Sequence, residues 1–193
     1  MNRFVIVGTT GSGKTTLARE LSRRIEAPHI ELDALNWGPN WTAASTDVFR
    51  AKAAEAVSGE RWVIDGNYQA VRDLVWSRAD CIVWLNYSFS LVLRRLLKRT
   101  ARRVFLAEPC CNGNRESLRL TLSKDSILLW ALTTYHRRRR KYPALLAERE
   151  VAGTCIVEHK TPAETKTWLQ TVGQAASLPL ASPTDECISN DLR

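Results

Sequence analysis

The residues best suited to chemistry lie near the start of the chain, in the run Gly8-Thr9-Thr10-Gly11-Ser12-Gly13-Lys14-Thr15. Its Gly-x-x-x-x-Gly-Lys-Thr spacing is that of a phosphate-binding loop, in which glycines let several backbone N–H groups point at one anion. Lys14 is expected to reach the outer phosphates of a nucleotide, and the Thr15 hydroxyl to ligate the Mg²⁺ that bridges them. The predicted nucleotide contacts are Gly8, Thr9, Thr10, Gly11, Ser12, Gly13, Lys14, Thr15 and Thr16.

The sequence on both sides of this loop supplies the strand and the helix that the motif requires. Residues 3–7 are apolar and rich in β-branched side chains, and Leu17, Leu21 and Ile25 recur at helical spacing. The positive end of such a helix adds to the attraction for an anion. The alternative is a glycine-rich turn that matches the motif by accident, which has a chance of about one per cent at average residue frequencies.

Strand and helix patterns alternate along the chain and predict an α/β domain with a doubly wound parallel sheet, covered by helices on both faces. The expected strands are residues 3–7, 29–33, 61–65, 80–86 and 154–158. The expected helices follow the phosphate loop and then cover about 45–58, 88–104, 117–141 and the stretch from 161 onward. Residues 34–44 are predicted to be a loop, and Pro143 is expected to lie beyond the end of its helix.

Two aspartates come at the ends of predicted strands. Asp33 ends the second strand and Asp65 ends the third. Because the carboxyl ends of parallel strands meet at one edge of a sheet, where such proteins bind ligands, we expect both carboxylates to lie near the phosphate loop.

Length and composition indicate an ordinary globular protein. The chain has 193 residues, enough for one well-buried domain and short for two, with 45% hydrophobic and 25% charged residues. Its five cysteines form no C-x-x-C pair, so neither a zinc site nor a disulfide framework is expected. No apolar run approaches the roughly 20 residues of a membrane span, and no export signal precedes the first strand. We expect a cytoplasmic monomer or small homo-oligomer that does not associate with membranes.

The net charge of +8 is concentrated in one segment. Residues 94–141 contain 14 Lys and Arg against only Glu108, Glu116 and Asp125, a net charge of +11. Such a segment could clamp the phosphates of a nucleotide, bind nucleic acid, or form a solvated helical face.

Several of these motifs together resemble a known group of proteins. They are Gly8 to Thr15, Leu32-Asp33-Ala-Leu-Asn-Trp37, Pro39-Asn-Trp41, Trp62-Val-Ile-Asp-Gly-Asn-Tyr68, Arg72 and Arg78-Ala-Asp80. The combination is similar to the bacterial adenylate-kinase-like proteins often labelled topology modulation proteins, within the nucleoside-monophosphate and shikimate kinase group. The resemblance implies a P-loop NTPase fold of three α/β/α layers, with a five-stranded sheet of order 2-3-1-4-5.

The same resemblance divides the chain. It implies a kinase-like domain over residues 1–172, with an acceptor-side insert at about 34–58 and a helical lid at about 104–124. Residues 173–193 are small and polar, and we predict that they form a disordered tail.

The resemblance also assigns roles to the two aspartates. Asp65 resembles an aspartate of adenylate kinases that faces Mg²⁺ through water; the alternative is that an Asp before Gly66 caps a turn. Asp33 could orient an acceptor hydroxyl and take its proton, as in shikimate-type kinases, or cap a helix. If the acceptor is instead a phosphate, no base is needed, and Arg50 and Arg72 would neutralise the two anions.

Arginines that arrive with lid closure are expected to stabilise the transferring phosphoryl group, because its charge spreads over several oxygens in the transition state. The candidates are Arg99, Arg102, Arg103 and Arg115, followed by Arg137. On the acceptor side, Asn67 is a predicted substrate contact, and the rings of Trp37, Trp41 and Tyr68 could stack on the acceptor or simply pack.

Three functional hypotheses follow. The leading one is an ATP- and Mg²⁺-dependent kinase that transfers the γ-phosphate to a small nucleotide-like or hydroxyl-bearing acceptor. The second is a nucleic-acid-associated ATPase or regulator, motivated by the basic segment, although no DNA-reading motif is present. The third is a nucleotide-binding protein without transfer activity, because the residues after Asp65 depart from the adenylate kinase pattern.

Overall fold

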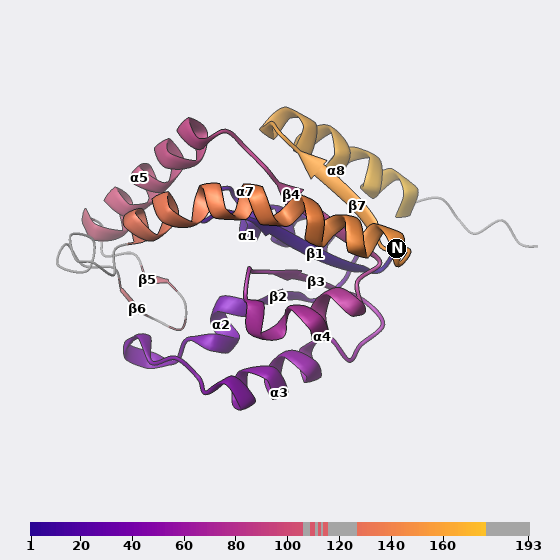
Figure 1. Ribbon diagram of the computed structural model, residues 1–193, viewed down its shortest axis with the longest axis horizontal. Helices are drawn as coiled ribbons and strands as arrows, with labels where there is room; N and C mark the ends of the chain where they lie inside the picture. The colour runs from indigo at the N-terminus through magenta and orange to yellow at the C-terminus, as the bar shows by residue number, and fades with distance from the viewer. Residues whose placement is uncertain (106–108, 111, 113, 116–126, 177–193) are drawn as a thin grey trace, which may run out of the picture.

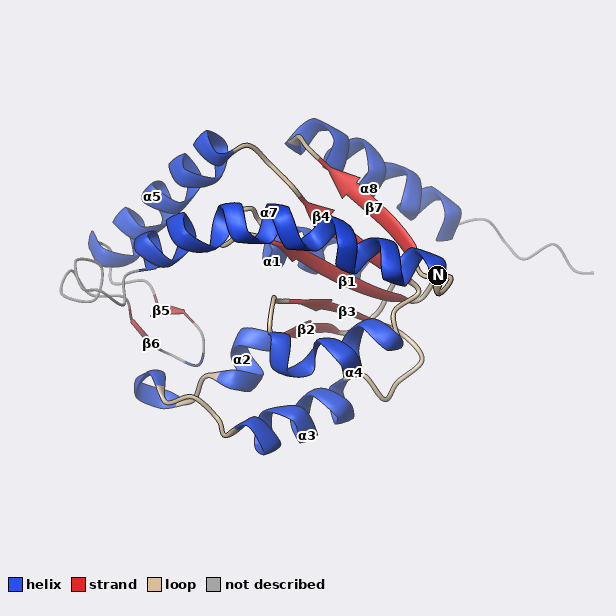
Figure 2. Ribbon diagram, viewed as in Figure 1, coloured by secondary structure: helices blue, strands red, loops and turns tan. Residues whose placement is uncertain are grey.

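A five-stranded parallel sheet forms the centre of the molecule (Figures 1 and 2). The computed structural model describes residues 1–105, 109–110, 112, 114–115 and 127–176. The strands of the sheet are β1 (Arg3–Gly8), β2 (His29–Glu31), β3 (Trp62–Asp65), β4 (Cys81–Leu85) and β7 (Cys155–His159). Their order is β2-β3-β1-β4-β7, and every pair is parallel. The predicted sheet, including its 2-3-1-4-5 order, is therefore confirmed.

Helices cover both faces of this sheet and give it three layers (Figure 1). One face packs against α3 (Thr46–Ala56), α4 (Arg72–Ser77) and α7 (Ile127–Val151), and the other against α1 (Lys14–Arg24) and α8 (Pro162–Ala176). The other helices are α2 (Leu32–Asn36) and α5 (Phe89–Phe105), with short 3₁₀ turns at Pro39–Trp41 and Gln69–Val71.

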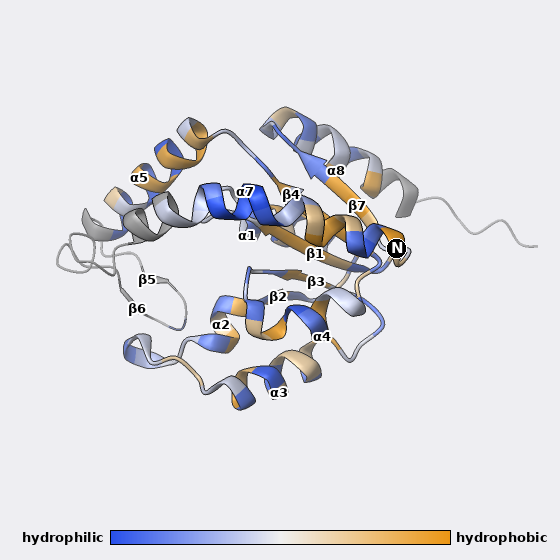
Figure 3. Ribbon diagram, in the orientation of Figure 1, coloured by the Kyte–Doolittle hydropathy of each residue, from blue (hydrophilic) through white to orange (hydrophobic). Residues whose placement is uncertain are grey.

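The alternation of side chains along β1 shows how the two cores form. Val5 and Val7 belong to one buried cluster, whereas Phe4 and Ile6 belong to the other. Because successive residues of a strand point to opposite faces, a strand buried on both sides must be apolar throughout. The central strands are accordingly hydrophobic along their length (Figure 3), and the central strand carries the phosphate loop at its end.

The segment after β2 differs from the prediction. The second strand ends at Glu31, and Asp33 lies in the first turn of helix α2 instead of at a strand end. Leu32 is buried and contacts Gly66, where an added Cβ would lie 2.7 Å from the Leu32 Cβ. The packing of Leu32 against Gly66 stabilises the start of α2. A helix therefore occupies the first part of the segment that was predicted to be a loop. The short helix α4 has no counterpart among the predicted elements.

Helix α7 is longer than the sequence pattern indicates. It continues through Pro143 to Val151, so the prediction that it ends before this proline is wrong. A proline inside a helix removes one backbone hydrogen bond. Tyr142 and Leu146 on either side of it are buried in the core, and this packing offsets the loss.

Most of the predicted lid, about 104–124, lies outside the described residues. A two-stranded antiparallel ribbon is described there, formed by β5 (Pro109–Cys110) and β6 (Asn114–Arg115). The predicted tail also lies outside, except that α8 extends to Ala176. Among the described helices, none is both long enough and apolar enough to span a membrane.

The start of β1 is tied to β4 by one carboxylate. Asp80 accepts hydrogen bonds from the backbone N–H groups of Asn2 and Arg3, and the Arg3 guanidinium lies 2.6 Å from its Oδ1. Burial would raise the pKa of Asp80, but these donors outweigh it and hold the pKa below its ordinary value of 3.8. Asp80 therefore stabilises the fold above that value, and this contribution is lost as pH falls through the lower folded pKa.

We expect Asp80→Asn to reduce the free energy of unfolding at pH 7 by about 1–2 kcal/mol, because an amide cannot accept all of these charge-assisted bonds. The variant should also lose part of the acid sensitivity of the wild type. Urea denaturation between pH 3 and pH 7 measures both. Asp73→Asn is the control, because its ion pair with Arg50 is exposed and should contribute much less. Equal losses in the two variants would contradict this account.

Candidate active site

The phosphate loop connects the end of β1 to the start of α1, as the motif requires. Gly13 precedes the first helical residue with φ 97° and Gly11 has φ 82°, which are left-handed conformations that side chains disfavour. An added Cβ on Gly11 would lie 3.0 Å from the Val92 carbonyl oxygen and 3.1 Å from the Leu96 Cβ of helix α5. Glycine at this position therefore lets α5 pack directly against the loop.

Lys14 lies in this loop with its Nζ donating a hydrogen bond to the Thr9 carbonyl oxygen at 3.2 Å. Burial lowers the pKa of Lys14 to about 8. The carboxylates of Asp65 and Asp33 raise it and only partly compensate, while nearby arginines lower it further. A polyphosphate bound at this point would place negative charge next to Lys14 and favour the charged form of its amine.

Thr15 and Asp65 form a close polar pair beside the loop. The Thr15 hydroxyl donates to Asp65 Oδ2 at 2.5 Å, and Asp65 is only 4% exposed. His29 Nε2 lies 3.5 Å from the other carboxylate oxygen. A hydroxyl and a carboxylate beside a phosphate site fit Mg²⁺, which takes few protein ligands and completes its shell with phosphate and water. Within the described residues, no group of three or more His, Cys, Asp or Glu side chains offers an alternative metal site.

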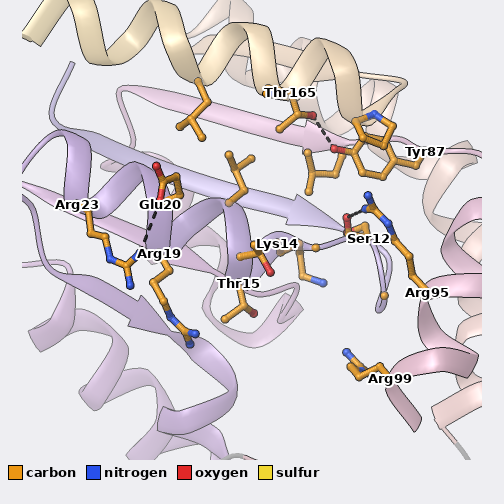
Figure 4. Close-up of a pocket in the computed structure, with 18 of the residues that line it drawn as sticks. Ser12, Lys14, Thr15, Arg19, Glu20, Arg23, Tyr87, Arg95, Arg99 and Thr165 are labelled. Carbon is orange, nitrogen blue, oxygen red and sulfur yellow. Dashed lines mark hydrogen bonds and ion pairs between the residues drawn. The ribbon is translucent and has the colours of Figure 1, made fainter. Parts of the chain in front are cut away.

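A cavity of about 900 Å³ opens beside the loop (Figure 4). Arg95, Arg99 and Arg103 of α5 line it, one helical turn apart. Arg95 donates to the Ser12 carbonyl oxygen at 2.9 Å and Arg99 to the Thr10 hydroxyl at 3.3 Å. The Arg95 guanidinium also lies over the Tyr87 ring, 5.4 Å from its centroid, and the Tyr87 hydroxyl lies 2.6 Å from the Thr165 hydroxyl. One wall of the cavity is thus cationic, and another wall is formed by β4 and α8.

The predicted lid arginines divide into three groups. Arg99 and Arg103 line the cavity, whereas Arg102 is exposed and does not. The side chain of Arg115 lies outside the described part of the structure. Arg95 was not selected as a site residue from the sequence, although an i, i+4, i+8 spacing with Arg99 and Arg103 places it on the same face.

Asp33 is held by Tyr68, which is itself held by Trp37. The Tyr68 hydroxyl donates to Asp33 Oδ1 at 2.6 Å, and Trp37 Nε1 donates to the Tyr68 oxygen at 3.0 Å. Tyr68 also packs edge-on against Phe49. The predicted residues Asp33, Trp37 and Tyr68 are thus brought together, and Trp41 packs edge-on against Trp37. Their joint effect is to orient one exposed carboxylate.

The arginines predicted for the acceptor have different environments. Arg50 makes a two-pronged ion pair with Asp73 and also donates to the Ala70 carbonyl oxygen. Arg72 lies over the Trp76 ring, 5.1 Å from its centroid. Arg50 of α3 is therefore engaged by Asp73 of α4 and by the 3₁₀ turn before that helix, whereas Arg72 stacks on a ring of its own helix.

Arg138 was not identified from the sequence, because it lies in an unbroken run of five basic residues. It is half-buried on α7, whereas Arg137, which was a candidate, is exposed. Burial lowers the pKa of Arg138, the charges of Arg137 and Arg72 lower it further, and Asp33 raises it. Arg138 therefore lies close enough to Asp33 and Arg72 for their charges to shift its pKa.

Asn67 has its side-chain amide directed at the backbone of the phosphate loop. Its Oδ1 accepts from the Gly8 N–H at 3.2 Å, and its Nδ2 donates to the Gly8 carbonyl oxygen. Contact between this residue and a substrate stays a prediction. Thr16 is exposed on the first turn of α1 and lines the cavity.

Comparison with known proteins supports the fold. No protein-family model matches the chain, and no curated protein matches it. Among solved structures, the shikimate kinase of Bacteroides thetaiotaomicron is 16% identical with a TM-score of 0.53, covering 92% of this chain and 99% of that chain. The shikimate kinase of Acinetobacter baumannii, in complex with shikimate, is 16% identical with a TM-score of 0.54, covering 91% and 92%. The fold is that of P-loop kinases.

A gluconokinase of Sinorhizobium meliloti 1021 is also similar, at 19% identity and a TM-score of 0.48, covering 90% of this chain and 94% of that chain. The two shikimate kinases, whose TM-scores exceed 0.5, show the shared fold, and at 16% identity they leave the acceptor open. The narrower resemblance to topology modulation proteins stays a prediction.

We expect nucleotide binding above pH 8 to take up a proton. Half of Lys14 is neutral at its pKa of about 8, and a bound triphosphate favours its charged form. Affinity for Mg·ATP should therefore fall by up to about tenfold per pH unit as pH rises above 8, until the pKa in the complex is reached. Calorimetry at pH 8.5 in two buffers of different ionisation enthalpy measures the uptake.

Lys14→Arg is the matched control, because its guanidinium stays charged at this pH and takes up no proton. Equal binding heats for the wild type in both buffers would contradict the lowered pKa.

Proposed function

We propose that this protein is a P-loop kinase that transfers the γ-phosphate of ATP to a hydroxyl group of a small acceptor. The observation that carries the proposal is the position of Asp33, an exposed carboxylate whose charge reaches Lys14 of the phosphate loop. The Tyr68 hydroxyl holds this carboxylate in place by a hydrogen bond. A base held next to the phosphate loop is what transfer to an alcohol requires.

The charge of Asp33 favours a hydroxyl over a phosphate as the acceptor group. A phosphate at this point would be repelled by the carboxylate, and Arg50, which was expected to neutralise it, is paired with Asp73. The guanidinium groups of Arg72 and Arg138 add positive charge on this side. They favour an acceptor that carries an anionic group some distance from its reacting hydroxyl.

The reaction then follows from the residues present. The acceptor oxygen attacks the γ-phosphorus, its proton passes to Asp33, and the bond to the β-phosphate oxygen breaks to release ADP. Lys14 and the arginines of α5 stabilise the charge that spreads over the phosphoryl oxygens. Thr15 and Asp65 would hold a Mg²⁺ ion, which would supply positive charge to stabilise the phosphate oxygens.

The names of the neighbouring structures agree with this choice, since two are shikimate kinases and one of them contains shikimate. Activity in the adenylate kinase manner, with a nucleotide as acceptor, is less well supported because of the carboxylate at Asp33. The proposal therefore names hydroxyl-bearing small acids as the first acceptors to test.

We expect a screen of hydroxy acids, sugars and nucleosides with Mg·ATP to reveal ADP release that Lys14→Ala abolishes. Asp33→Asn should lower kcat for the active acceptor by about 100-fold or more, because it removes the base, and leave the affinity for Mg·ATP within about threefold. Asp47→Asn, an exposed carboxylate on α3, is the control and should match the wild type. No transfer above the Lys14→Ala background to any acceptor would overturn the kinase proposal.

A second candidate, association with nucleic acid, is favoured by one observation. Arg137, Arg139, Arg140 and Lys141 are exposed together on α7, outside the lining of the nucleotide cavity. The middle of α7 accordingly forms a strongly hydrophilic stretch (Figure 3). Such a run can contact a phosphate backbone without reading sequence.

If this candidate holds, the protein should bind duplex DNA at low salt, with affinity that falls steeply as salt rises. Arg140→Gln with Lys141→Gln should make the slope of log K against log salt shallower by about two units, because each contact contributes about 0.9. Lys52→Gln with Lys160→Gln removes the same charge from other exposed positions and should change the slope less. Fluorescence anisotropy measures all three, and absence of binding at about 50 mM salt would discard the candidate.

A further inference from the structure

The first glycine of the phosphate loop lies where the sheet ends unevenly. On one side, β1 pairs with β4 up to Gly8 and Leu85. On the other side, β1 pairs with β3 only up to Ile6 and Asp65, with one further bond from the Gly66 N–H to the Ile6 carbonyl. The N–H and C=O groups of Gly8 on this side consequently have no strand to pair with.

The side chain of Asn67 takes the place of the missing strand. Its amide accepts from the Gly8 N–H and donates to the Gly8 carbonyl oxygen, and so replaces the backbone acceptor and donor that a longer β3 would supply. Gly8 cannot be held by a side chain of its own. An added Cβ would lie 2.9 Å from both the Leu85 carbonyl oxygen and the Ser12 hydroxyl. The position of Gly8 therefore depends on contacts made to its backbone.

A third bond fixes Asn67 itself. The Tyr142 hydroxyl of α7 lies 3.1 Å from Asn67 Oδ1. The two groups of Gly8 determine which end of the amide is oxygen, so the tyrosine must donate. Burial raises the pKa of Tyr142 and keeps this hydroxyl protonated.

Tyr142 is in turn rigidly packed. It is 3% exposed, and its ring lies 5.7 Å from the Trp84 ring and 6.1 Å from the Trp76 ring. Helix α7, which carries Tyr142, runs across the sheet in front of β1 (Figures 1 and 2). The chain of contacts thus leads from a core helix to the backbone of the phosphate loop.

We propose that Asn67 and Tyr142 are positioning residues that fix Gly8 and thereby the shape of the phosphate loop for nucleotide binding. For its effect on nucleotide affinity, this inference rests on the proposed function. The positioning of Gly8 does not. Tyr142 acts only through Asn67, so its contribution should vanish when Asn67 is removed.

Tyr142→Phe is the decisive variant, because it keeps the ring between the two tryptophans and removes only the hydroxyl. We expect exchange of the Gly8 amide hydrogen to become about 3- to 10-fold faster and Mg·ATP affinity to fall by about 2- to 10-fold, with the melting temperature nearly unchanged. Asn67→Ala should have a larger effect, and the double variant should match Asn67→Ala. Tyr135→Phe is the control, because it removes a buried hydroxyl of the same helix that bonds to Tyr87 instead.

Two outcomes would overturn the inference. One is wild-type exchange of the Gly8 amide in Tyr142→Phe, and the other is a double variant in which the two single effects add. If the wild type binds no Mg·ATP, the proposed function fails, and amide exchange alone still decides whether these residues hold Gly8.

Discussion

The rest of the structure depends on one constraint, which is that neighbouring elements pack directly against the backbone of the phosphate loop. Helix α5 can contact the loop only because Gly11 has no side chain, and this contact brings Arg95 and Arg99 within hydrogen-bonding distance. Gly8 in the same way admits the end of β4. The cationic wall of the cavity is thus a consequence of loop packing, and a larger residue at either glycine would displace whole elements.

Charge is the second organising factor. The loop lysine is surrounded by arginines, and burial together with this repulsion lowers its pKa to about 8. Asp65 and Asp33 are the carboxylates that counter this field, and they occupy separate places. Asp65 is buried against Thr15, while Asp33 is exposed and held by Tyr68. One carboxylate therefore suits a metal beside the phosphates, and the other suits an acceptor, a division that a symmetric pair of carboxylates could not provide.

Helix α7 connects the two halves of the site. It carries Arg138, whose pKa is lowered by burial and raised in part by the charge of Asp33, and, one turn later, Tyr142, which donates to Asn67 beside the phosphate loop. Because Tyr142 is wedged between two tryptophans, the helix contacts the loop through a rigid ring. The basic run of this helix consequently has two faces, one directed at the site and one exposed to solvent.

The sequence by itself determined the phosphate loop, the parallel sheet and the position of Asp65 at its edge, because these follow from local backbone geometry and from the rules of parallel sheets, whereas the order of the strands came from the family resemblance. Only the tertiary structure decided that α7 continues through Pro143, that Arg138 and not Arg137 faces the site, and that Asn67 holds Gly8. Each of these depends on packing between residues far apart in the chain. Pro143 is tolerated because its neighbours are buried, and the amide of Asn67 acquires its role because β3 ends before β1. Neither the burial of these neighbours nor the early end of β3 can be read from the periodicity of the sequence.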